Sequence, residues 1–149
     1  PGGGEGAHAR GSRLGDRNAE DQLVLFESDN KDFQLHAGDL LFHKLHPVMD
    51  VSAGSNSKGW IESVTKIAEL CDDKTVVVPG HGEITDKLGL LGQITYFEKI
   101  RAAVEAAIGE GKSREDVMKL TPDEFKSFGN DGRRPVVLGA IFDEIKAAK

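Results

Sequence analysis

The chain has 149 residues, 38% of them hydrophobic and 30% charged, which suits one compact domain and is too short for two of ordinary size. A formal net charge of -6 and a pI near 5.4 exclude the basic footprint of a nucleic-acid-binding or anionic-membrane-binding protein. The sequence contains neither a long apolar run of the membrane-spanning kind nor the apolar centre of a signal peptide. We therefore expect a cytoplasmic protein that binds a small-molecule substrate or a protein.

The first residues have the composition of a leader rather than of a domain. Residues 1–15 include six glycines and show no apolar period, so they cannot bury enough surface to offset the entropy of ordering them. We expect residues 1–18 to be a disordered or foreign leader and residues 19–149 to form the domain. The run Q-L-V-L-F at 22–26 then predicts a first strand, followed by a polar turn over 27–32.

Two further strands are predicted, and each carries a chemically useful side chain. The run F-Q-L-H-A-G-D-L-L-F at 33–42 contains Asp39 after a glycine, and a helix is expected over about 59–70. The run T-V-V-V at 75–78 fits a strand buried on both faces, which Pro79 should end. Gly80 and Gly82 then flank His81 in a tight loop. The sequence thus predicts an imidazole and a carboxylate at neighbouring strand ends.

The rest of the chain is predicted to be helical. Apolar residues at helical spacing indicate a long helix from near Lys87 to a stop at 109–111. A helical tail is expected from about residue 112, with helix starts at Ser113 and Thr121 and a last helix over about 135–147. The predicted fold class is therefore α/β, with three strands in one sheet and helices predominant after Lys87.

Asp39 and His81 are candidate metal ligands, because a carboxylate and an imidazole on a rigid sheet suit Zn²⁺ or a similar divalent ion. Two ligands alone do not complete such a site. The alternative is that both are loop residues whose polar atoms are satisfied by backbone hydrogen bonds.

The order of motifs resembles the C-terminal half of a metallo-β-lactamase-fold hydrolase. The resemblance rests on G-D-L-L-F, a loop with His-Pro and Asp, a G-W-I helix, V-V-V-P-G-H-G and a long helix, and it covers about residues 19–111. It implies half of an αββα sandwich and two zinc ions, with Asp39 bridging the metals and His81 completing the second site. It also implies hydrolysis of an ester, amide, thioester or lactone by metal-bound hydroxide. His46 would lie in the loop beside the metals and contact substrate or water, the alternative being a solvated loop residue.

The sequence departs from that family in its first-site ligands. The H-x-H-x-D-H motif is absent, and Arg17 stands where the family has another histidine, although a guanidinium cannot ligate a metal. We therefore expect an incomplete hydrolase, whose open apolar sheet face is covered by a second copy or by a partner chain. The alternatives are a non-catalytic remnant that acts as an interaction domain or partner-dependent subunit, and a glyoxalase-II-like thioesterase.

Overall fold

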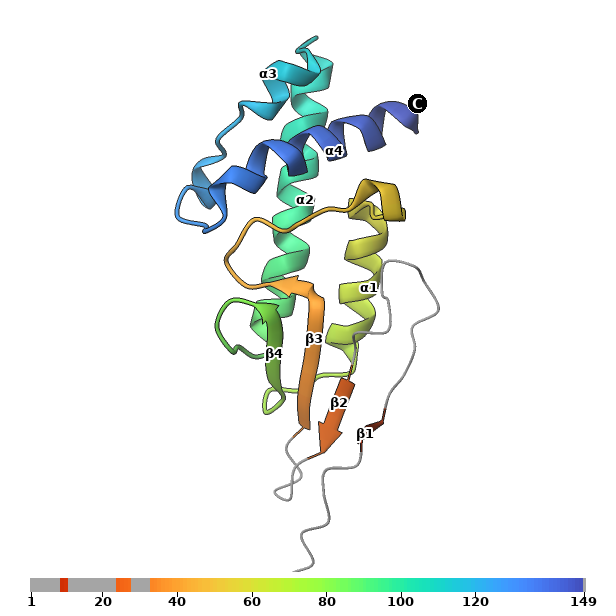
Figure 1. Ribbon diagram of the computed structural model, residues 1–149, viewed down its shortest axis with the longest axis vertical. Coiled ribbons are helices and arrows are strands. Elements are labelled where there is room, and N and C mark those ends of the chain that lie inside the picture. Colours follow the sequence, from red (N-terminus) through yellow and green to blue (C-terminus); the bar gives the residue numbers. More distant parts are fainter. Residues whose placement is uncertain (1–8, 11–23, 28–32, 149) are drawn as a thin grey trace, which may run out of the picture.

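The architecture is a mixed α/β fold in which helices pack on one face of a small sheet. We analysed a computed structural model that describes residues 9–10, 24–27 and 33–148. Figure 1 shows α1 and α2 side by side behind the sheet, with α3 and α4 beyond the end of β3. The elements are β1 (Ala9–Arg10), β2 (Val24–Glu27), β3 (Phe33–Phe42), α1 (Ser57–Glu69), β4 (Val76–His81), α2 (Lys87–Gly109), α3 (Arg114–Met118) and α4 (Arg134–Ala147), with 3-10 turns at Val51–Ala53, Asp123–Phe125 and Asp131–Arg133.

The strands lie in the order β1-β2-β3-β4. The pairs β1–β2 and β2–β3 are antiparallel, whereas β3 and β4 are parallel and are joined through α1. A crossover helix is what a parallel neighbour requires. The three predicted strands correspond to β2, β3 and β4, so the α/β class is confirmed.

The strand β1 was not predicted. It lies within the leader that we expected to lack regular structure, where Ala9–Arg10 pair with β2. The other leader residues, Arg17 included, lie outside the described part of the chain. The domain boundary after residue 18 therefore stays a prediction.

The burial predicted for the three valines is wrong for two of them. Val77 has no exposed surface, but Val76 and Val78 are half-buried. The cause is the layering, because the helices cover only the face that carries Val77. On the other face, Val76 and Val78 lie beside their register partners Gln34 and His36. The second half of an αββα sandwich, which would cover this face, stays a proposal.

The strand β4 also continues past Pro79, which we expected to end it. The Val77 N–H points away from β3 and donates to the Thr85 carbonyl at 2.8 Å, while Thr85 N–H returns a bond to the Val77 carbonyl at 2.9 Å. Backbone nitrogens two residues apart in a strand face the same side, so the Pro79 nitrogen also faces away from β3. Proline therefore costs the sheet no hydrogen bond here, as is usual on an edge strand.

The long helix begins and ends where the sequence predicted. The Asp86 side chain caps α2 by accepting a hydrogen bond from Leu88 N–H at 2.8 Å, and the helix ends at Gly109. The predicted helix starts at Ser113 and Thr121 differ in outcome. Ser113 caps α3, whereas Thr121 precedes only the 3-10 turn Asp123–Phe125.

One hydrophobic core runs from the sheet through α1 and α2 to α4. Its largest fully buried apolar side chains include Leu35, Leu41, Ile67, Phe97, Ile100 and Ile141. A polar contact fastens α4 to the start of α1, where Glu144 accepts hydrogen bonds from Ser57 N–H and Oγ–H at 2.9 and 2.8 Å. Glu144 also accepts from Lys58 N–H at 3.1 Å and from Arg101 Nη1 at 2.9 Å. Asn56 is the N-cap of α1, and Glu144 from the last helix satisfies two further N–H groups of its first turn.

Candidate functional site

Asp39 lies in an irregular stretch of β3 rather than at a simple strand end. Gly38 pairs with Pro79 and Phe42 pairs with His81, so β3 advances by four residues where β4 advances by only two. Gly38 has a φ of 53°, which an L-residue with a side chain rarely adopts. An extra stretch of this kind bends a strand and re-aims its side chains. Here it turns Asp39 out to solvent.

A close approach of the two strands brings Asp39 to His81. A Cβ atom added at Gly80 would lie 2.5 Å from the Gly38 carbonyl oxygen, so only glycine fits at this crossing. Asp39 Oδ1 lies 3.4 Å from His81 Nε2, and the side chains are 72% and 51% exposed. The structure therefore brings the two predicted metal ligands together on an open surface.

One face of the His81 imidazole packs against the hydrophobic core. Its ring stacks on Phe42, with centroids 4.6 Å apart and planes inclined by 10°. Phe42 is buried and meets Trp60 edge-on at 6.1 Å. The His81 carbonyl also accepts a hydrogen bond from His43 N–H at 3.0 Å. A packed ring beneath the imidazole and a fixed backbone restrict where Nε2 can point.

The two donors fit one divalent ion but do not complete its site. Ligands about 2.1 Å from a tetrahedral ion lie about 3.4 Å apart, which matches the separation of Asp39 Oδ1 and His81 Nε2. Across residues 9–10, 24–27 and 33–148, however, no cluster of three or more His, Cys, Asp and Glu side chains is placed to hold a metal. The same distance also suits an ion pair between the carboxylate and a protonated imidazole. No catalytic step through a metal follows from the described residues alone.

His46 lies in the core rather than in a solvated loop. It has no exposed surface, and its Nδ1 shares a 2.8 Å hydrogen bond with the Tyr96 hydroxyl. Burial lowers the pKa of His46 below its usual range, against the raising effect of Asp131, and burial raises the pKa of Tyr96. The His46 ring contacts the rings of Tyr96 and Phe128 rather than that of His81. The solvated alternative is wrong, and a substrate contact stays a prediction that requires the loop to open.

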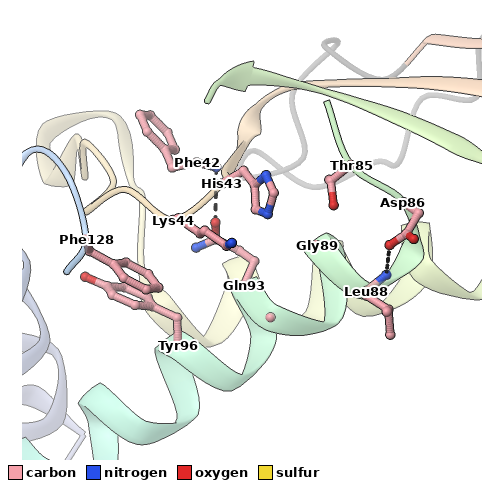
Figure 2. A pocket seen from close by; sticks show the side chains of 11 residues that line it. Phe42, His43, Lys44, Thr85, Asp86, Leu88, Gly89, Gln93, Tyr96 and Phe128 are labelled. Atoms are coloured by element: carbon pink, nitrogen blue, oxygen red, sulfur yellow. Dashed lines mark hydrogen bonds between the residues drawn. The ribbon is translucent and has the colours of Figure 1, made fainter. Parts of the chain in front are cut away.

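A pocket that sequence reasoning missed lies between the end of β3 and the first half of α2. It has a volume of about 410 Å³, and Figure 2 shows its walls. The lining residues are Phe42, His43, Lys44, Thr85, Asp86, Leu88, Gly89, Gly92, Gln93, Tyr96 and Phe128. One signal was present in the sequence, since Gln93 interrupts the apolar stripe that Leu90 and Phe97 mark on the helix. Neither Asp39 nor His81 lines this pocket.

Comparison with known proteins adds little to this geometry. No family model matches the chain, and no curated protein sequence matches it. A crystal structure of VMB-1, a metallo-β-lactamase, matches with a TM-score of 0.38 and 23% identity. That match covers 51% of this chain and 34% of VMB-1, so the chain spans about a third of its length. None of the helices in the described ranges is both long and apolar enough to cross a membrane.

Proposed function

We propose that this chain supplies Asp39 and His81 to the metal site of a hydrolase that cleaves an ester, amide, thioester or lactone. The observation that carries the proposal is the 3.4 Å separation of two exposed donor atoms on a rigid strand crossing. The motif order around Asp39 and His81, which resembles the metallo-β-lactamase-fold hydrolases, supports the same assignment.

The two residues have complementary roles in such a site. Asp39 offers an anionic oxygen and His81 a neutral nitrogen, and the stacking on Phe42 holds the imidazole in place. A bound divalent ion supplies Lewis acidity, which lowers the pKa of water and polarises a substrate carbonyl. The remaining ligands have to come from outside the described residues or from another chain. The open surface around Asp39 and His81 leaves room for them.

A second candidate function is a subunit or interaction domain that works only with a partner. The observation that favours it is the sheet face that none of the described helices covers, where Val76 and Val78 stay half-buried. A partner sheet or a second copy that covered this face would bury both valines. Light scattering across a concentration series tests self-association, and a Val76→Lys variant should weaken any dimer that uses this face.

Zinc titration tests the metal assignment. We expect weak binding of a single ion, with well under one equivalent retained after desalting, because two protein ligands hold zinc loosely. Asp39→Asn and His81→Gln should each weaken affinity about tenfold or more, since even residues that only orient a ligand cost that much. His43→Gln is the matched control, because His43 is a neighbouring histidine that bonds the Glu83 carbonyl instead. Unchanged zinc affinity in both site variants would refute the assignment.

Hydrolysis assays test the activity separately. The isolated chain should cleave generic esters, thioesters and lactones no faster than a buffer containing zinc. Adding a separately produced half-domain that carries an H-x-H-x-D-H motif should raise turnover, and His81→Gln should abolish that gain. Metal-dependent turnover by the chain alone would show that its other residues complete the site.

A further inference from the structure

We propose that the 410 Å³ pocket beside α2 binds a small apolar monocarboxylate, with its carboxylate at Lys44 and Gln93 and its hydrocarbon body between the aromatic rings. This proposal does not depend on the metal assignment, because Asp39 and His81 lie outside the pocket.

The walls of the pocket are mostly apolar. Phe42 and Leu88 line it together with the rings of Tyr96 and Phe128. The Tyr96 and Phe128 rings stack nearly parallel, with centroids 5.7 Å apart and planes inclined by 10°, so they form a rigid aromatic part of the wall. The volume lies within the range of about 300–1,000 Å³ that is usual for small-molecule sites. A short alkyl chain or a single aromatic ring suits this space.

Lys44 supplies a cation at one end of the pocket. Its backbone has a φ of 57°, an unfavourable conformation for lysine that the surrounding structure has to maintain. Hydrogen bonds from Gly129 N–H to the Lys44 carbonyl at 3.0 Å and from His46 N–H to the Gly129 carbonyl at 2.9 Å hold the turn. Within the described residues, Lys44 forms no ion pair. The fold thus presents an unneutralised ammonium group to the pocket.

Gln93 supplies a second donor to the pocket that Lys44 lines (Figure 2). Its side chain is only 4% exposed, and Oε1 accepts a hydrogen bond from Phe42 N–H at 3.1 Å. That bond fixes the orientation of the amide, so the Nε2 group remains available as a donor. Lys44 and Gln93 both line the pocket, so a ligand bound there can meet the ammonium group and this free amide donor together. A carboxylate satisfies both groups at once.

The opposite end of the pocket selects against a second anionic group. Asp86 lies there with its carboxylate capping α2, as Figure 2 shows, and it repels negative charge. The two ends of the pocket therefore carry opposite charges, a cation at Lys44 and an anion at Asp86. A monocarboxylate with an apolar tail fits this polarity, whereas a dicarboxylate does not.

Octanoate is the probe that we would use, with octanamide as its uncharged counterpart and octylamine as its cationic one. Titrations of the full 149-residue chain, followed by ¹H–¹⁵N correlation spectra at pH 7, should shift the backbone amides of Phe42, Gly92 and Phe128. We expect octanoate to bind at least about fivefold more tightly than octanamide, because a hydrogen bond to a charged group is stronger than one to a neutral group. Raising the salt concentration should reduce the difference in affinity between octanoate and octanamide, because salt screens the attraction between the carboxylate and Lys44.

Two variants locate the binding site. Gly92→Leu should fill the pocket and reduce octanoate affinity at least about tenfold, since a Cβ at Gly92 meets nothing within 4 Å and the helix tolerates leucine. Gly109→Leu is the matched control, because Gly109 lies in the same helix, is equally open and is remote from the pocket. Lys44→Met should remove the preference for octanoate over octanamide, and Lys44→Arg should retain it.

Three results would overturn the proposal. The first is octanamide binding as tightly as octanoate, which would show that Lys44 does not select an anion. The second is unchanged affinity in a folded Gly92→Leu variant, which would place the ligand elsewhere. The third is chemical-shift changes spread evenly over the surface. Should Gly92→Leu fail to fold, the comparison of Lys44→Met with Lys44→Arg still decides the question.

Discussion

The contact between Glu144 and the start of α1 should contribute a large part of the stability of this fold. Glu144 accepts four hydrogen bonds, three from Ser57 and Lys58 at the helix start and one from Arg101. Glu144→Ala leaves the Ser57 and Lys58 N–H groups of the first helical turn without their acceptor, which costs about 1 kcal/mol, and removes a hydrogen bond between charged groups, worth about 2 kcal/mol. The Glu144 and Arg101 side chains are only 20% and 24% exposed, so water replaces these bonds poorly. We expect a loss of about 3 kcal/mol.

Urea denaturation followed by circular dichroism measures this loss, and thermal unfolding should show a decrease in Tm of roughly 10 °C. Glu105→Ala is the control, because Glu105 also pairs with Arg101 but at 3.9 Å and with a 56% exposed side chain. It should cost no more than about 0.5 kcal/mol. A double-mutant cycle between Glu144→Ala and Arg101→Met should give a coupling energy of about 1 kcal/mol or more. If Glu144→Ala and Glu105→Ala are equally mild, the inference from these contacts is wrong.

Two other perturbations test the core and the strand crossing. Burial lowers the pKa of His46 from its usual value of 6.5, so the unfolded chain binds a proton on this imidazole more readily than the folded chain does. The stability that neutral His46 contributes should therefore be complete above pH 6.5 and should fall as the pH drops below 6.5. A His46→Gln variant should show a shallower loss in urea denaturation between pH 7 and 5, and an identical slope would refute the assignment. Gly80→Ala forces a Cβ against the Gly38 carbonyl and should cost about 2 kcal/mol, whereas Gly132→Ala, in open space, should change stability by less than about 0.5 kcal/mol. Equal stability of the two alanine variants would show that the strands can separate without cost.

The sequence predicts those parts of the fold that local patterns determine. The helix α2 was predicted closely because its limits depend on neighbours in the sequence, the Asp86 cap and the stop at Gly109. The pair of Asp39 and His81 was also found, since each residue follows a recognisable strand pattern. The role of Pro79 was predicted wrongly because it depends on which side of β4 meets β3, and that is a property of the assembled sheet.

Other features depend on tertiary placement and left weak signals or none. The two-residue strand β1 exists through its pairing with β2, and so short a segment carries no periodic pattern. The burial of His46 results from packing against Tyr96 on a helix 50 positions away in the sequence, which a His-Pro loop does not reveal. The pocket at Lys44 likewise combines a turn with a distant helix face.

The outer edge of β4 also bears on whether other chains can pair with this sheet. An edge strand with free N–H and C=O groups is a template on which another chain can add a strand and start aggregation. Along β4, Thr85 already occupies both outward backbone groups of Val77, and Pro79 has no N–H to offer. An incoming strand would therefore find few groups to pair with on this side of the sheet. The proline and the short return of the chain at Thr85 together protect the edge beside His81, which can stay open to ligands without inviting intermolecular sheet growth.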